Sequence, residues 1–113
     1  MGDNRSGPGA QPMFSDSELS ALRAFVGGYL HEDFAVEHGI PAAALAAYSR
    51  EATRKELLEL ESDFEWFLKK TREMDFGTLR ELFVRELRSG WSPPNRAALT
   101  HLARMVRLQL SAR

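Results

Sequence analysis

Between residues 53 and 72 the large apolar side chains recur at intervals of three and four positions, which places them on one face of an α-helix. The members of this row are Leu57, Leu60, Phe64 and Phe67. Thr53, followed three positions later by Glu56, forms the pattern of a capping box at a helix N-terminus. No segment shows the alternation of apolar and polar residues typical of a strand. The sequence therefore predicts an all-α fold.

Two further helices are predicted before this segment. Ser15 and Glu18 form a second capping-box pattern. The apolar row that follows it is Leu19, Leu22, Val26 and Tyr29. Gly27 and Gly28 near the end of this row either admit a close helix neighbour or begin the unwinding of the helix. The next helix is alanine-rich and runs from Pro41, a residue suited to a first helical turn, to about Ala52.

Two more helices are predicted after it. Thr78 and Glu81 form a third capping-box pattern, and Gly90 is placed to end that helix at its C′ position. The core residues of this helix are Leu79, Leu82, Phe83 and Leu87. Asn95 is predicted to cap the last helix. Its buried face comprises Leu99, Leu102, Val106 and Leu110.

The expected architecture is a compact bundle of about five helices joined by short loops. Residues 1–13 are rich in Gly, Pro, Asn and Ser, so we predict a disordered tail there and a single helical domain over 14–113. The chain has no cysteine, no basic-then-apolar secretory signal, and no apolar run near the roughly 18 residues of a membrane span. We therefore expect a cytoplasmic protein without a membrane partner.

Charge is unevenly distributed along the chain. Residues 1–75 hold 14 acidic and 8 basic side chains, whereas residues 76–113 hold 2 acidic and 7 basic ones. Within the helix that begins at Thr53, Glu56, Glu59 and Asp63 share one face beside the apolar row. Like charges at these spacings slightly destabilise a helix, and a cationic partner would relieve the repulsion. These three residues, with Glu32 and Glu37, are the predicted binding site, although an ordinary solvated helix face is the alternative.

Other functions find less support in the sequence. His31, Asp33, Glu37 and His38 are ligand types for zinc or iron, but their spacing matches no metal motif, so we predict no metal or cofactor. A bundle of this size offers little room for a substrate cleft and contains no cysteine nucleophile and no phosphate loop, so we predict that the protein is not an enzyme. The alternative function is a helical regulatory or nucleic-acid-binding module that uses the basic last helix, whose arginines include Arg96, Arg104 and Arg107.

The segment Gly27-Gly28-Tyr29-Leu30-His31-Glu32-Asp33-Phe34 is costly for a helix to accommodate, because each interior glycine destabilises a helix by roughly 1 kcal/mol relative to alanine. Glu37, Gly39, Pro41 and Tyr48 follow at short distance. Read together, residues 25–48 resemble the small immunity proteins of bacterial contact-dependent growth inhibition systems. Phe34 stands where many members carry tryptophan, and His38 where an aromatic residue such as tyrosine is common.

The resemblance implies a function that the residues alone do not. Such proteins bind and neutralise the toxin domain delivered by a neighbouring cell, and they are inhibitors rather than catalysts. Many of these toxins are nucleases with basic clefts, which an acidic face would complement. The motif residues are expected to be mainly structural and comprise Gly28, Tyr29, His31, Asp33, Phe34, Gly39 and Tyr48.

Overall fold

The computed structural model describes residues 13–33, 35 and 39–112 of the chain. Over these ranges it contains five α-helices and no strand, which confirms the predicted all-α class. The helices are α1 (Ser20–Tyr29), α3 (Pro41–Glu51), α4 (Arg54–Lys70), α5 (Phe76–Leu87) and α6 (Arg96–Ser111). The predicted tail lies outside the described residues except for Met13.

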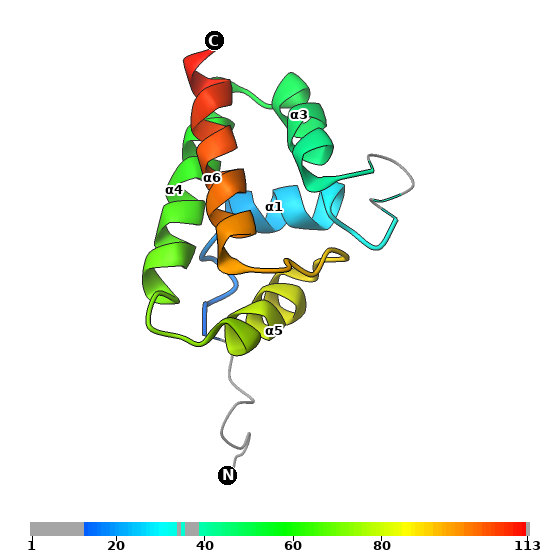
Figure 1. The fold of residues 1–113 in the computed structure, drawn as a ribbon. Coiled ribbons are helices and arrows are strands. Elements are labelled where there is room, and N and C mark those ends of the chain that lie inside the picture. Colours follow the sequence, from blue (N-terminus) through cyan, green and yellow to red (C-terminus); the bar gives the residue numbers. More distant parts are fainter. Residues whose placement is uncertain (1–12, 34, 36–38, 113) are drawn as a thin grey trace.

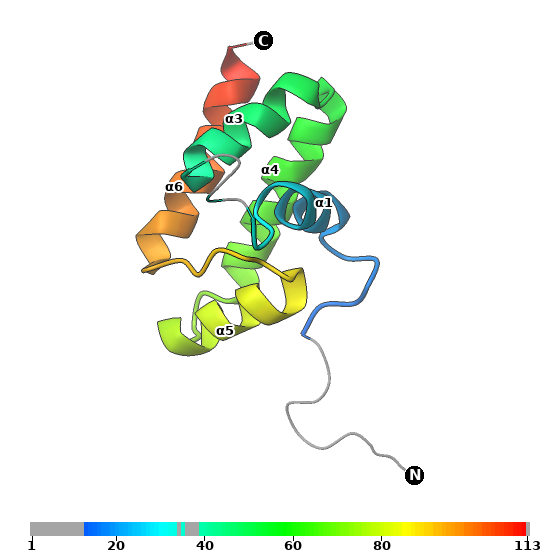
Figure 2. The same cartoon turned by 90° about the vertical axis from the view of Figure 1, so that its right-hand side faces the viewer.

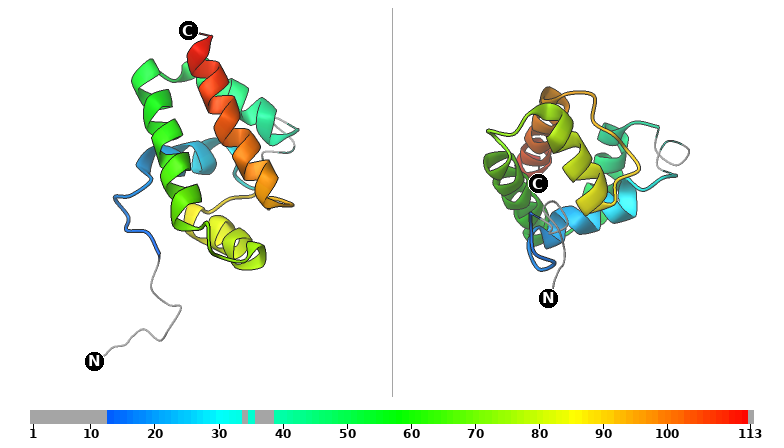
Figure 3. Two further views of the ribbon diagram at one scale, coloured as in Figure 1. Left: turned by 60° about the vertical axis from the view of Figure 1, so that its left-hand side comes forward. Right: turned by 90° about the horizontal axis from the view of Figure 1, so that it is seen from below.

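The two longest helices, α4 and α6, lie side by side and run in opposite directions (Figure 1). Helix α1 crosses this pair and packs on α4, while α3 lies against both α6 and α1 (Figure 2). Helix α5 closes the lower end of the bundle, as the view from below in Figure 3 shows. On one side of the molecule, α1 therefore contacts both α3 and α4.

The predicted apolar rows of α4, α5 and α6 all face the core. A chain of aromatic rings extends this core from the N-terminal segment to the α5–α6 connection. Phe14 stacks on Phe67 at 5.6 Å between ring centroids, Phe67 meets Phe83 at 5.8 Å, and Phe83 meets Trp91 at 6.0 Å. The Glu86 carboxylate accepts the backbone N–H groups of residues 13 and 14, which fixes this segment against α5.

Three predicted helix starts are confirmed. Pro41 is the first residue of α3, and Asn95 caps α6 by accepting the N–H of Ala98 at 2.9 Å. At α4 both halves of the capping box are present, because the Thr53 hydroxyl accepts the Glu56 N–H and the Glu56 carboxylate accepts the Thr53 N–H.

The predicted start of the first helix is wrong. Glu18 accepts the Ser15 N–H at 2.9 Å, but α1 begins only at Ser20. Leu19 adopts a left-handed conformation, with φ 62°, and its buried side chain supplies no cap. The cap comes instead from α4, where one oxygen of Asp63 accepts the N–H groups of residues 21 and 22 at 2.9 and 3.0 Å.

The predicted boundaries of the fourth helix are also wrong. Helix α5 begins at Phe76 because the Asp75 side chain is its cap, and Thr78 donates its N–H to that carboxylate. The left-handed residue at the other end is Arg88, with φ 55°, rather than Gly90. The Thr78–Glu81 pattern therefore lies inside the helix.

Gly90 has a different role: it allows the backbone at this position to lie close against another segment of the backbone. Its N–H donates to the Leu30 carbonyl at 2.6 Å. A Cβ at this position would lie 2.3 Å from the carbonyl carbon of His31 and 2.4 Å from the Cα of Glu32. By contrast, a Cβ at Gly27 or Gly28 would meet nothing within 4 Å, so these two glycines admit no close neighbour and only precede the end of α1 at Tyr29.

Replacing Gly90 with alanine should therefore lower the free energy of unfolding by about 1–3 kcal/mol, the usual cost of overpacking. The methyl group would overlap backbone atoms, which cannot move aside as a flexible side chain can. Urea unfolding followed by circular dichroism measures the change. The matched control is Gly28→Ala, which should raise the same free energy by about 0.5–1 kcal/mol because alanine favours the helix. Equal losses in the two variants would contradict the close approach at Gly90.

Asp63 offers a second test. Asp63→Ala removes the only side-chain cap that the described residues provide for α1, and should cost about 1–2 kcal/mol of stability. Asp63→Asn keeps an acceptor oxygen and should retain most of that stability, although it removes the charge. Urea unfolding of both variants measures the difference, and equal stability of the two would show that Asp63 does not act as a cap.

Candidate functional site

Three of the predicted acidic residues, all on α4, act electrostatically on one side chain of α3. The phenol of Tyr48 is half-buried, and its pKa is raised first by that burial and then by the negative charges of Glu56, Glu59 and Asp63. Only nearby carboxylates can exert such an effect. We refer to Glu56, Glu59 and Asp63, together with Tyr48, as the acidic face.

The three carboxylates of the acidic face are not equivalent. Glu56 is engaged in the capping box of α4, and Asp63 caps α1. Glu59 is exposed, and across the part of the chain that the structure describes its carboxylate makes no hydrogen bond or ion pair. A partner could therefore bind Glu59 without displacing any contact inside the protein.

Two other acidic residues of α4, Glu61 and Glu65, face the opposite way, toward α6. Arg107 donates to Glu61 at 2.8 Å and to Glu65 at 3.2 Å. These contacts, first that with Glu61, raise the pKa of Arg107. Helix α4 thus separates its carboxylates into a side that forms ion pairs with Arg107 and a side, that of Glu56, Glu59 and Asp63, that forms none with a described cation.

The motif tyrosines form an aromatic cluster beside the acidic face. The Phe25 ring lies 6.3 Å from that of Tyr29 and 5.3 Å from that of Tyr48, and the two tyrosine rings are 5.4 Å apart. The Tyr29 hydroxyl hydrogen-bonds to Glu51 at the end of α3, and this bond is the main cause that raises the pKa of Tyr29. The cluster joins α1 to α3 and brings a further carboxylate, Glu51, to the same side of the molecule.

The remaining motif residues lie in the α1–α3 connection. His31 accepts the Asp33 N–H at its Nδ1 atom, at 3.1 Å, and Gly39 adopts φ 84°, a left-handed conformation. Glu32 is exposed, and its backbone lies against Gly90 at the start of the α5–α6 connection. No contact in the described chain joins Glu32 to the acidic face. The other residues predicted here, Phe34, Glu37 and His38, lie outside the described residues.

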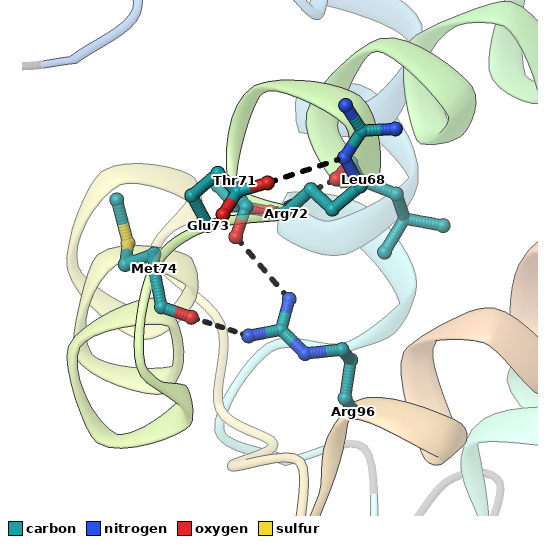
Figure 4. A network of polar contacts seen from close by, with 6 residues as sticks. All are labelled: Leu68, Thr71, Arg72, Glu73, Met74 and Arg96. Atoms are coloured by element: carbon teal, nitrogen blue, oxygen red, sulfur yellow. Dashed lines mark hydrogen bonds and ion pairs between the residues drawn. The ribbon is translucent and has the colours of Figure 1, made fainter.

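Two arginines of the last helix, on which the alternative function depends, are engaged in contacts inside the protein. Figure 4 shows the Arg96 guanidinium pointing at the turn after α4, where it donates to the carbonyls of Thr71 and Met74 at 3.2 and 2.5 Å. Arg107 is paired with the carboxylates of α4, so Arg104 is the basic residue of α6 that keeps an exposed side chain without such a contact in the described chain. A basic phosphate-binding surface needs a denser set of such residues.

Two residues of this side were not singled out from the sequence, Glu51 and Trp66. Trp66 is 40% exposed and follows Asp63 by three positions on α4. The helical spacing could have identified it, because residues seven apart, such as 59 and 66, lie on the same face. Glu51 could not be identified in this way, since its approach to Tyr29 depends on how α3 packs against α1.

No helix within the described ranges 13–33, 35 and 39–112 is long and apolar enough to cross a bilayer. No group of three or more His, Asp or Glu side chains in these ranges is arranged to hold a metal ion. Glu37 and His38, two of the potential metal ligands named from the sequence, lie outside the described residues.

Comparison with known proteins identifies the family. The family model described as CdiI immunity protein matches residues 18–107. No curated protein and no solved structure matches the chain. The match extends well beyond the motif between residues 25 and 48 on which the resemblance was based. The chain therefore belongs to the CdiI immunity protein family, whose members neutralise the toxins of contact-dependent growth inhibition systems.

Proposed function

We propose that this immunity protein neutralises its cognate toxin by stoichiometric binding through the acidic face of α4. Membership of the family supports the role of an inhibitor rather than a catalyst. The binding mode is our own inference and rests on one observation above all: Glu59 is an exposed carboxylate, between two others, that the described protein leaves without a partner.

Electrostatics supports this side of the molecule. Glu56, Glu59 and Asp63 lie on successive turns of one helix and repel one another. Burial is the main cause that raises the pKa of Tyr48, and the combined field of these carboxylates raises it further. A cationic surface on the toxin would reduce the repulsion and would be attracted to the site from a distance.

The partner that best fits such a face is a nuclease. Nucleases bind phosphate groups and therefore carry basic clefts, so carboxylates placed in such a cleft would oppose the same cations as the substrate does. We expect this encounter to take place in the cytoplasm. Glu32 and Glu37 stay predicted contacts, but Glu32 lies with the α5–α6 connection and would need a toxin surface that extends around the molecule.

The test uses the cognate toxin domain and measures its association with this protein by surface plasmon resonance. Glu59→Lys should lower the association rate constant by about threefold to tenfold, because steering depends on the charges nearest the interface. The rate should also fall as salt rises, since the screening length shortens to about 8 Å at physiological ionic strength.

Glu81→Lys is the matched control. Glu81 is an exposed glutamate of α5, and its reversal changes the net charge by the same amount far along the chain from α4. The association rate constant of this variant should stay within about twofold of the wild-type value if electrostatic steering depends on charges near the interface. If both reversals slow association equally, only the overall charge matters and the acidic face is not the binding surface. Survival of cells that express the toxin with each variant provides the functional measurement.

A further inference from the structure

Trp66 is a large apolar side chain that the fold leaves 40% exposed on α4. It lies seven residues after Glu59, which is close to two helical turns, or about 10.5 Å along the axis. The two side chains therefore project from the same side of the helix. Other exposed apolar residues lie elsewhere: Leu58 lines a groove with Arg107 of α6, and Leu108 projects from α6 itself.

Contacts on two sides fix the orientation of the Trp66 ring. Its Nε1 donates to one oxygen of Glu18 at 3.1 Å, and the other oxygen of Glu18 accepts the Ser15 N–H. The Lys70 ammonium lies over the ring, 5.3 Å from its centroid. An exposed aromatic ring that is already held in place loses little conformational entropy when a partner covers it.

We propose that Trp66 is the apolar anchor of the toxin interface, which rests on the function proposed above. The occupant is the same toxin domain, with an apolar pocket for the indole beside its cationic surface. Three features support this choice: Trp66 continues the surface of the acidic face, its ring is preorganised, and tryptophan is the residue type most enriched among binding hot spots.

The two residues then have separable effects on the kinetics of binding. Glu59 acts at a distance and governs the association rate, whereas Trp66 acts only after contact and governs dissociation. A merely structural role of Trp66 would change the stability of the free protein instead. The experiment therefore measures both rate constants and the thermal midpoint of each variant.

With the whole chain and the cognate toxin domain, Trp66→Ala should raise the dissociation rate constant by about 30-fold, the size expected of a hot spot. Association should stay within about twofold of the wild type. Leu108→Ala, which truncates a 61% exposed apolar side chain on α6, is the matched control and should leave both rates unchanged. Trp66→Leu loses the bond to Glu18 but keeps apolar area, so its dissociation rate should lie between those of the wild type and Trp66→Ala.

Two results would overturn the anchor while the proposed function stands. The first is a dissociation rate constant for Trp66→Ala equal to that of the wild type, in an experiment where Glu59→Lys still slows association. The other is a dissociation rate for Trp66→Leu equal to that of Trp66→Ala with a lowered thermal midpoint in both, which would assign Trp66 a structural role through Glu18. Absence of binding by the wild-type chain would instead refute the proposed function itself, and the anchor with it.

Discussion

The contact between Asp63 and the first turn of α1 determines how the functional side of this protein is assembled. Helix α1 has no cap of its own, because Leu19 is left-handed and apolar. The carboxylate that replaces the cap belongs to the middle of α4, and it satisfies two N–H groups that would otherwise lack acceptors. A negative charge at a helix N-terminus is also favoured by the helix dipole. This bond fixes α1 across α4, and the aromatic cluster of Phe25, Tyr29 and Tyr48 then fixes α3 beside both.

In this arrangement the residues that stabilise the fold differ from those that we propose for toxin binding alone. Glu56 and Asp63 contribute charge to the acidic face but also cap helices, so substitutions there change the fold as well as the surface. Glu59 and Trp66 cap no helix: the Glu59 carboxylate makes no hydrogen bond or ion pair in the described chain, and the indole of Trp66 interacts with the side chains of Glu18 and Lys70. A family that must match different toxins can vary residues of the second kind at little structural cost.

Local signals in the sequence predicted the helices well. The apolar rows, the capping box at Thr53, the cap at Asn95 and the proline at position 41 all depend on residues within one or two turns. The failures depend on tertiary contacts. The start of α1 is set by a residue more than 40 positions away, and Gly90 is required by the backbone of His31 and Glu32, which no local pattern reveals. The acidic residues of α4 could be assigned to one face from spacing, but their separate roles could not.

The charges of α4 show why the assignment of roles needs the structure. Read as a sequence, Glu59, Glu61, Asp63 and Glu65 form one acidic run, and the arginines of the last helix form one basic group. In the folded chain Arg107 pairs with Glu61 and Glu65, and Arg96 binds carbonyl groups. These two arginines of the last helix and these two carboxylates of α4 are therefore engaged in contacts inside the protein. Among the carboxylates of α4, Glu59 is the one that makes no hydrogen bond or ion pair in the described chain, and it lies beside the half-buried Tyr48 and on the same side as Trp66. An exposed carboxylate next to held aromatic rings is a surface suited to a partner with both cationic and apolar groups.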